Sequence, residues 1–172
     1  MTLHIRPGGT ADVPAVLRLL DGAVDWLVAH GRPGQWGTTP MSAVPRRVAM
    51  TETMAANGEL HVATLGDDVV GAIGVGTAPD YVPAAREPEL YVTLLVTDRA
   101  HAGSDIGGRL LDHARGLART AGVGLLRVDC YAGVDQALVR YYERQGFTAT
   151  ESFVVNLPAM VWPGRILQER LT

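Results

Sequence analysis

Leu94-Leu-Val-Thr-Asp-Arg-Ala-His-Ala-Gly-Ser-Asp-Ile-Gly-Gly-Arg-Leu-Leu111 decides the fold, because this stretch joins a strand, a glycine-containing turn and a helix. The residues from Glu89 to Thr97 are β-branched and apolar enough for a central strand. Those from Ser104 to about Ala121 predict a helix with one apolar face. Such a turn directs free backbone N–H groups and the positive end of a helix toward one point, which suits a pyrophosphate. The alternative is that its three glycines only permit a tight turn and close packing.

A second element, Ala137-Leu-Val-Arg-Tyr-Tyr-Glu-Arg-Gln-Gly-Phe147, predicts a helix that ends at Gly146, with a strand starting at Phe147. Three of its side chains lie on one side of the helix, at spacings of three and four residues: Leu138, Tyr141 and Tyr142. Taken alone, the two tyrosines are core residues. Their phenols are also long enough to reach a cleft beside the helix.

The rest of the chain alternates strand-like and helix-like segments. The expected elements are a strand at 3–6, helices at 10–30 and 44–56, strands at 60–65, 69–75 and 89–97, a helix at 104–121, a strand at 125–130, a helix at 134–145 and a strand at 147–156. Thr10 is the expected N-cap of the first helix, and Met50 is expected among the buried residues of the second. Long loops at 31–40 and 79–88 interrupt the pattern. This order predicts a single α/β or α+β domain.

Length and composition fit one domain with its own core. The chain has 172 residues, of which 47% are hydrophobic and 19% are charged, which excludes wholesale disorder. No apolar run is long enough for a transmembrane helix, and residues 1–7 lack the basic and apolar regions of a secretory signal. We therefore expect a cytoplasmic protein that does not bind membranes.

Charge and metal-ligand content argue against two further classes of protein. All 15 basic residues are arginine against 18 acidic residues, and the net charge of −3 has the wrong sign for binding a phosphate backbone. We therefore expect no nucleic-acid partner. The single cysteine, Cys130, cannot close an intramolecular disulfide, and the five histidines do not fall at the spacings of a metal site. No metal is expected.

The two elements, taken together in their order, resemble the signature regions of the GNAT superfamily of acyl-CoA-dependent N-acyltransferases. The order of elements is similar to that fold from Leu3 to about Asn156, including the Val70-Gly71 step in the third strand. The resemblance implies a GNAT fold, with a mixed central sheet of six to seven strands flanked by about four helices. It also implies that residues 1–172 form one N-acetyltransferase domain that uses acetyl-CoA.

In that family the turn usually reads Arg/Gln-x-x-Gly-x-Gly/Ala, and its backbone amides bind the coenzyme A pyrophosphate. Six residues occupy these positions here: Ala102, Gly103, Ser104, Asp105, Ile106 and Gly107. Gly107 fits the pattern, whereas Ala102 replaces the usual Arg or Gln and Asp105 replaces a glycine. The resemblance also implies that backbone amides of the preceding strand bind pantetheine and the thioester oxygen, at Leu95, Val96 and Thr97.

The second family signature, Asn-x-x-Ala-x-x-x-Tyr-x-x-x-Gly-Phe, aligns with residues 135–147. Tyr142, Gly146 and Phe147 match it, while Asp135 stands in place of Asn and Leu138 in place of Ala. The resemblance implies that Asp135 helps to bind the coenzyme and that Tyr142 protonates the departing thiolate. A phenol with a pKa of ~10 suits this step because it stays protonated at neutral pH. The alternative is that Tyr142 is only a packed helix residue.

Transfer to an amine also needs a base and an acceptor site. Glu89 is the leading candidate for the base, with Asp129 and a water molecule as alternatives, since a lone carboxylate at a strand end is more often solvated than catalytic. Acceptor residues are expected from the first helices, the long loops and the central strands: Trp26, Trp36, Tyr81, Tyr91 and Asp129. Rings and carboxylates of this kind suit a cationic amine. The alternative is that Trp26 packs in the core and the acids are ordinary surface residues.

The leading interpretation is a cytoplasmic enzyme that moves an acetyl group from acetyl-CoA to a primary amine of a small molecule, by direct attack on the thioester. One alternative is acetylation of a protein N-terminus or lysine, which needs an open groove. Another, motivated by Asp105, is a coenzyme A-binding or ligand-binding module without turnover. The length of the donor's acyl chain stays open. The apolar segment Val161–Leu167 either packs onto the core or joins a second copy in a homodimer.

Overall fold

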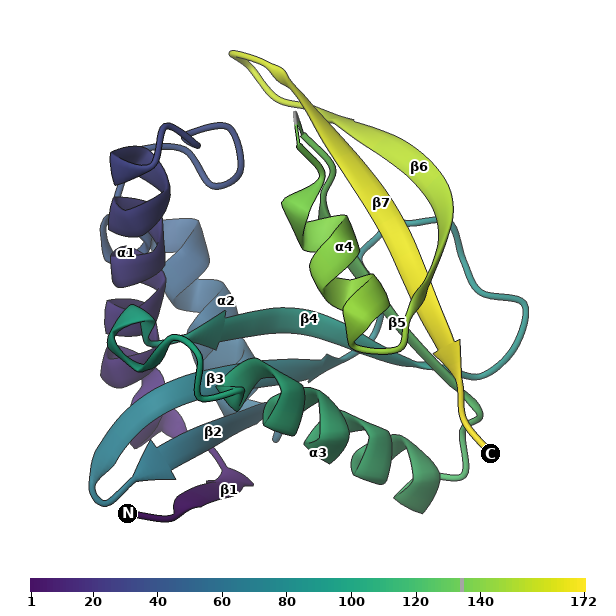
Figure 1. The fold of residues 1–172 in the computed structure, drawn as a ribbon, viewed down its shortest axis with the longest axis horizontal. Coiled ribbons are helices and arrows are strands. Elements are labelled where there is room, and N and C mark those ends of the chain that lie inside the picture. Colours follow the sequence, from purple (N-terminus) through teal and green to yellow (C-terminus); the bar gives the residue numbers. More distant parts are fainter. Residues whose placement is uncertain (134) are drawn as a thin grey trace. The chain divides into compact units, whose positions relative to one another are not determined.

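The computed structural model describes residues 1–133 and 135–172, which form a mixed seven-stranded sheet with four α-helices (Figure 1). The strands are β1 (Leu3–Pro7), β2 (Leu60–Leu65), β3 (Asp68–Gly76), β4 (Leu90–Thr97), β5 (Leu125–Tyr131), β6 (Thr148–Asn156) and β7 (Val161–Arg170). The helices are α1 (Val13–Ala29), α2 (Pro45–Ala56), α3 (Ile106–Thr120) and α4 (Ala137–Arg144), with short 3-10 helices η1 (Thr10–Asp12), η2 (Met41–Ala43) and η3 (Arg99–His101). The predicted fold class is confirmed.

The strands are hydrogen-bonded in the order β1-β2-β3-β4-β5-β7-β6. β4 and β5 are parallel over Leu90–Val92, whereas β7 is antiparallel to both β5 and β6. The chain divides into two compact units. Unit 1 comprises Met1–Val75 and Leu94–His113, and unit 2 comprises Gly76–Thr93 and Ala114–Thr172.

The core of unit 1 forms around the apolar face of α1. The apolar residues that recur at helical spacing along α1 are all buried: Val13, Val16, Leu17, Leu20, Val24 and Leu27. Except for Leu27, they cluster with Leu60 and Val62 of β2, and the side chains of Trp36 and Met54 pack against the cluster. The helical spacing of apolar residues therefore identified the buried side of α1 correctly.

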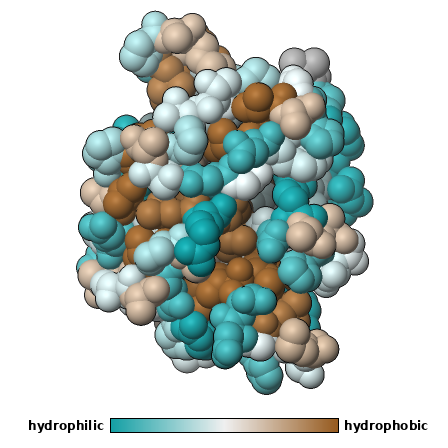
Figure 2. Space-filling view, turned by 90° about the vertical axis from the view of Figure 1, so that its left-hand side faces the viewer, coloured by the Kyte–Doolittle hydropathy of each residue, from teal (hydrophilic) through white to brown (hydrophobic). Residues whose placement is uncertain are grey.

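Two local predictions for unit 1 are wrong. Thr10 does not cap α1; it begins η1, and the Asp12 carboxylate accepts a hydrogen bond of 2.9 Å from the Gly9 amide. Met50 is 45% exposed, because α2 turns other residues toward the core. Apolar side chains also reach the surface on the side of α1 and α2, where Figure 2 shows brown patches between hydrophilic residues.

The start of α3 lies against β3, and Gly71 makes this contact possible. A methyl group at position 71 would lie 2.8 Å from Ile106 Cγ2 and 3.0 Å from Leu110 Cδ1, and both of these side chains are buried. Gly71 therefore sets how closely the helix after the turn approaches the sheet. Farther along α3, Nε2 of His113 lies 3.0 Å from Nδ1 of His61.

In unit 2, β7 lies between β5 and β6, and β6 and β7 form a long twisted hairpin (Figure 1). The sequence prediction ended the sheet at residue 156, because Pro163 and Gly164 interrupt the strand pattern of the C-terminal segment. Of the two expectations for Val161–Leu167, packing within its own chain is confirmed.

We predict that Gly71→Ala destabilises the protein by about 1–3 kcal/mol, since the added methyl group must displace Ile106 or Leu110 in a packed core. Gly116→Ala is the matched control in α3. Apart from its chain neighbours and the backbone of its own helix, no atom lies within 4 Å of its added methyl group, so replacing this helix glycine is expected to stabilise the protein by up to about 1 kcal/mol. Urea unfolding followed by circular dichroism measures both changes. Equal stability of the two variants would contradict a tight contact at Gly71.

Candidate functional site

The turn between β4 and α3 combines two residues with positive φ. It begins with Asp98, whose Oδ1 accepts a backbone hydrogen bond of 2.9 Å at the start of η3. Gly103 has a φ of 88°, which glycine adopts at low cost. Asp105 has a φ of 53°. The helix α3 therefore begins at Ile106, two residues after the predicted start at Ser104. The predicted pyrophosphate-binding residues thus form a loop that ends at a helix N-terminus with free N–H groups.

The Asp105 side chain folds over the first turn of α3. Its Oδ2 and Cγ atoms lie 2.7 and 2.8 Å from the position that a Cβ atom at Gly108 would take. A carboxylate is favourable at this end of a helix because it faces the positive end of the dipole. It therefore occupies space where an anionic ligand would gain the same interaction.

The strand residues predicted to bind the donor, Leu95, Val96 and Thr97, form the end of β4. The Val96 side chain is buried in the core of unit 1, so the alternation of a strand turns the two neighbouring side chains to the other face. The Asp98 amide then donates a hydrogen bond of 2.8 Å to the Val70 carbonyl, which attaches the end of β4 to β3. Binding by the three backbone amides stays a prediction.

Arg99, which we did not predict, lies directly over the indole ring of Trp26. Its guanidinium carbon is 3.8 Å from the ring centroid, and the same ring stacks on His30 at 4.0 Å. Burial lowers the pKa of Arg99, but a guanidinium remains a cation at neutral pH. Trp26 therefore lies outside the core cluster and supports the cation that follows β4. No local pattern reveals this pair, because its members are distant in the chain.

A pocket of about 210 Å³ opens beside Arg99. α1 contributes four residues to it, among them Arg18, and Asp98 lies on the other side. Two guanidinium groups and one carboxylate line the pocket, so its net charge is positive. It is therefore better suited to an anion than to a cation.

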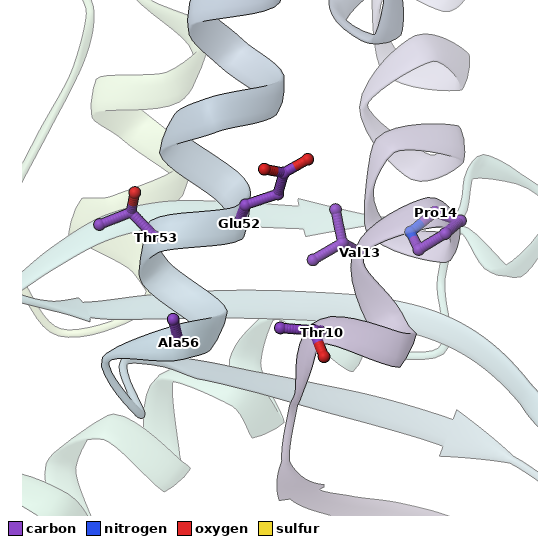
Figure 3. Close-up of a pocket in the computed structure, with 6 residues that line it drawn as sticks. All are labelled: Thr10, Val13, Pro14, Glu52, Thr53 and Ala56. Carbon is purple, nitrogen blue, oxygen red and sulfur yellow. The ribbon is translucent and has the colours of Figure 1, made fainter.

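A larger pocket of about 480 Å³ lies between the start of α1 and the C-terminal half of α2 (Figure 3). Its lining residues are Thr10, Val13, Pro14, Glu52, Thr53 and Ala56. All of them except Val13 are exposed, and none was predicted as a site residue. This shallow groove gives no support for a functional site.

Trp36, the other acceptor residue predicted in unit 1, packs against the core cluster around α1. The chain that follows it is attached to α1 by Asp21, whose carboxylate accepts hydrogen bonds from the Ser42 amide at 2.9 Å and the Ser42 hydroxyl at 2.6 Å. The Trp36 ring therefore has a packing role in unit 1, and its role in acceptor binding stays a prediction.

In unit 2 the structure brings Tyr91 of β4 and Asp129 of β5 together. The hydroxyl of the fully buried Tyr91 donates a hydrogen bond of 2.5 Å to Asp129 Oδ2. Burial raises the pKa of Asp129, although the hydrogen bond and the nearby Arg127 favour its ionised form. Burial and the Asp129 charge raise the pKa of Tyr91 far above its usual value, so the phenol keeps its proton. A carboxylate with a raised pKa is suited to accept a proton in catalysis.

Glu89, the leading candidate for the base, forms an ion pair with the buried Arg127. Its Oε1 accepts a hydrogen bond of 2.9 Å from Nη2, and its Oε2 accepts another from Nε. Arg127 also donates to the Pro83 carbonyl at 3.0 Å, and the ion pair raises the pKa of the guanidinium. Both oxygens of the Glu89 carboxylate are thus occupied by this bidentate contact with the cation. Asp129 is therefore better placed than Glu89 to act as the base.

Tyr142, the predicted acid, is buried on α4. Its ring meets those of Tyr141 and Phe147 edge-on, with centroids 5.3 and 5.7 Å away. Burial raises the pKa of Tyr142, and the neighbouring Cys130 raises it further, so the phenol is protonated at neutral pH, as a general acid must be. Burial also raises the pKa of the Cys130 thiol, to about 12.

Asp135 supports the start of α4, whose N-cap residue is Gln136. Its carboxylate accepts a hydrogen bond of 3.1 Å from the Ala137 amide. The helix predicted at 134–145 is therefore shorter, since its first described turn begins at Ala137. Val134, its predicted first residue, lies outside the described residues. Coenzyme binding by Asp135 stays a prediction beside this structural role.

The end of α4 is held by Arg115, which the helix pattern places off the apolar face of α3. Arg115 is nevertheless buried; it donates hydrogen bonds of 2.5 Å to the Gln145 carbonyl and 2.7 Å to Glu169 Oε2. Gly146 follows with a φ of 105°, and a Cβ atom there would lie 3.3 Å from Glu169 Oε1. Gly146 of the second signature thus has a structural reason, independent of any ligand.

Each unit holds part of the predicted site. Unit 1 contains the turn, the end of β4, Trp26 and Trp36, and unit 2 contains the following residues: Tyr81, Glu89, Tyr91, Asp129, Asp135 and Tyr142. Within residues 1–133 and 135–172, no group of three or more His, Cys, Asp or Glu side chains is placed to hold a metal ion. The helices of this part of the chain also include none with the length and apolar character needed to cross a membrane.

Solved structures of acetyltransferases share this fold. One is yncA from Salmonella typhimurium, solved with its cofactor acetyl-CoA, which is 20% identical with a TM-score of 0.70 over 100% of this chain and 95% of that one. A ribosomal-protein-alanine N-acetyltransferase from Brucella melitensis is 22% identical with a TM-score of 0.72, over 98% and 99% of the two chains. A proposed phosphinothricin N-acetyltransferase is 20% identical with a TM-score of 0.67, over 99% of both chains.

Similarity at this level of identity establishes the fold, and the sequence itself identifies the family. A comparison with curated proteins gave no match. The model of the acetyltransferase (GNAT) family, however, matches residues 20–147, which include both signature regions and most of the chain. The chain therefore belongs to the GNAT family of acetyltransferases.

Proposed function

We propose that this chain transfers an acetyl group from acetyl-CoA to the primary amine of a small molecule. The observation that carries the proposal is the Asp129 carboxylate, partly buried and hydrogen-bonded to Tyr91, in a chain of the GNAT family. Tyr142 in the same unit supplies a protonated phenol. These groups provide the base and the acid that the transfer needs. The presence of acetyl-CoA in the yncA structure supports the same donor for this chain.

In the proposed reaction the amine nitrogen attacks the thioester carbonyl carbon, so a C–N bond forms as the C–S bond breaks. Asp129 accepts the proton that the ammonium group loses. Tyr142 donates its proton to the departing sulfur, since a thiol has an ordinary pKa of about 8.5. Backbone amides at the end of β4 stabilise the thioester oxygen as it gains charge, an effect of about 3 kcal/mol per donor in other enzymes.

The pyrophosphate of the donor is proposed to bind at the loop Ala102–Gly107. Ala102 lacks the side chain that the family usually has there, and Arg99 offers a cation three residues earlier. Arg18 adds a second cation to the pocket beside it. Asp105 opposes this binding, because its carboxylate lies over the first turn of α3. Donor affinity is therefore a balance between these two arginines and one acid.

A small molecule is the proposed acceptor because Asp129 is partly buried behind a fully buried tyrosine, where a slender amine reaches it more easily than a folded protein does. The alternative is a protein N-terminus or lysine, and the name of the Brucella melitensis enzyme specifies a ribosomal-protein alanine. The similar structures include both kinds of enzyme and do not decide between them. A cytoplasmic location and a homodimer stay predictions.

Thiol release from acetyl-CoA tests the proposed function. The acceptors are a panel of small primary amines and short peptides with a free N-terminus or a lysine. Release with small amines supports the proposal, and release with peptides alone contradicts the small-molecule acceptor. No release with any acceptor, despite coenzyme binding, would favour a binding module. Longer acyl-CoA donors in the same assay define the acyl chain.

Asp105→Gly is expected to tighten acetyl-CoA binding several-fold, and Asp105→Asn somewhat less. At ~6 Å and an effective dielectric of ~20, Coulomb's law gives about 3 kcal/mol of repulsion per phosphate charge, which salt and water reduce substantially. The gain in affinity is therefore expected to shrink in high salt. Because Asp105 has a φ of 53°, glycine also relieves backbone strain, and we expect a gain in stability of about 1 kcal/mol.

Calorimetry with acetyl-CoA at two salt concentrations measures the affinities, and thermal unfolding measures the stability. Glu52→Gln is the control for the change in net charge, because it removes an exposed carboxylate from α2 of the same unit. Unchanged or weaker binding in both Asp105 variants would show that this carboxylate does not oppose the phosphates.

Tyr142→Phe is expected to lower kcat by roughly 10- to 1000-fold, the range for one positioned general acid, with little change in the KM for acetyl-CoA. The phenylalanine ring keeps the edge-on contacts with Tyr141 and Phe147, so the fold should persist. Tyr141→Phe is the matched control and should keep kcat within twofold of the original. Steady-state kinetics of both variants measures this. Normal turnover in Tyr142→Phe would remove the acid role.

The pH dependence of kcat/KM is expected to identify Asp129 as the base. Activity needs its ionised form, so it falls as pH falls through a pKa that lies above the ordinary Asp value. Tyr91→Phe removes a hydrogen bond that favours ionisation and should move this acid limb to higher pH. Asp129→Asn should abolish the limb, while Glu89→Gln should leave it in place.

These pH profiles are compared with one acceptor, whose own ionisation is the same for every variant. Loss of the acid limb in Glu89→Gln, but not in Asp129→Asn, would return the base role to Glu89. A limb that persists in both variants would favour proton removal by water.

A further inference from the structure

Unit 2 places aromatic residues on the face of the sheet that carries Asp129. Tyr131 follows Asp129 by two residues on β5, so both side chains point to the same face. Tyr131 is opposite Gly164 of β7, and Gly164 is opposite Phe153 of β6. Residues opposite each other in antiparallel strands share a face. Trp162, two residues before Gly164, lies on that face as well.

Four rings form a continuous series on this face, which we name the aromatic row: Tyr81, Phe153, Trp162 and Tyr131. Their successive ring centroids are 5.7, 6.2 and 5.6 Å apart. Gly164 gives the row its space, because a Cβ atom there would collide with the Phe153 ring. The Phe153 ring therefore lies across the backbone of β7.

The aromatic row adjoins the Tyr91–Asp129 pair. Phe153 packs against the cluster that Tyr91 forms with Val82 and Ile166. At the other end of the row, Tyr131 follows Asp129 by two residues on β5, so the two side chains are neighbours on the same face. Tyr81 is 51% exposed, and the other three residues of the row are half-buried, so the rings are open to a ligand.

The surroundings of the aromatic row hold little charge. Residues 152–164, which supply Phe153 and Trp162, contain no Asp, Glu, Lys or Arg. Arg127 and Glu89, on the same face beyond the Tyr91–Asp129 pair, neutralise each other. The hydrogen-bond partner of Asp129 is a neutral phenol. Two exposed carboxylates lie near the row in the sequence, Asp80 before Tyr81 and Glu151 two residues before Phe153, and Glu151 interacts with Arg127. Asp129 is the partly buried carboxylate at the edge of the row.

We propose that the amine bound at this site is an arylalkylamine, with its ammonium group at Asp129 and its ring on the aromatic row. This rests on the proposed function only in treating the bound amine as the acceptor. The two-residue step from Asp129 to Tyr131 covers about 7 Å, which a short alkyl linker spans. The rings favour another ring by offset or edge contacts, and their faces also attract a cation. An aliphatic amine lacks the ring, and a peptide brings polar groups that the row does not match.

Kinetics with phenethylamine, hexylamine and a short peptide with a free N-terminal alanine tests this proposal. We expect kcat/KM for phenethylamine to exceed that of the other two by about tenfold or more. Phe153→Leu and Tyr81→Ala should each lower it about fivefold, mainly through KM, as expected for the loss of one ring contact. The values for hexylamine should fall less, because an alkyl chain lacks the ring contacts, and the KM for acetyl-CoA should stay within twofold.

Val154→Ala is the matched control. Val154 lies next to Phe153 on β6, is 59% exposed and points to the opposite face of the hairpin, so its replacement should change neither amine's kinetics. Tyr81→Ala changes an exposed loop residue and keeps the test valid if Phe153→Leu unfolds. Thermal unfolding of each variant shows whether it does.

Equal or better use of hexylamine or the peptide would overturn the inference and leave acetyl transfer intact. An equal effect of Tyr81→Ala on all acceptors would also overturn it, since the row would then only support the fold. Calorimetry with phenethylamine alone separates the two proposals. Binding that weakens fivefold in Tyr81→Ala, without turnover of any acceptor, would refute the proposed function and support the ligand class. Absence of both binding and turnover would overturn both.

Discussion

Arg115 places one buried positive charge where three elements of unit 2 meet. From α3 its guanidinium binds Glu169 of β7 and the Gln145 carbonyl at the end of α4, and it lies 5.7 Å from the Phe147 ring centroid. A cation is favourable at the C-terminal end of a helix, and removing one partner of a buried pair costs about 3–5 kcal/mol. These contacts fix the end of α4. The position of Tyr142 on that helix depends on them.

The periodic parts of the chain were predictable because burial is decided locally there. The apolar residues of α1 follow the helical repeat from Val13 to Leu27, and all of them are buried. β7 was missed for the opposite reason. Pro163 and Gly164 suggest a break when they are considered alone, yet in the sheet Gly164 makes room for a ring that comes from β6. Only the register of three strands reveals that use of a glycine.

The candidate site also combines residues that a local pattern predicts with residues whose role depends on distant parts of the chain. Tyr142 follows from a signature, and Tyr91 and Asp129 were expected in the site because they lie on the two central strands. The choice between Glu89 and Asp129 was not predictable, because it depends on Arg127, which no local pattern links to Glu89. The direction of Asp105 was likewise hidden, since it depends on a backbone angle that a side chain rarely adopts. Long-range partners and unusual backbone angles are the information that a local reading of residues lacks.

Cys130 is the one cysteine of the chain, and a pKa of about 12 keeps its thiol protonated near neutral pH. A protonated, buried thiol is a poor nucleophile, so the proposed reaction has no step in which Cys130 carries the acetyl group. With direct attack, donor and acceptor are bound together before the first product leaves. Double-reciprocal plots at several acceptor concentrations then form intersecting lines, in contrast to the parallel lines of a ping-pong enzyme.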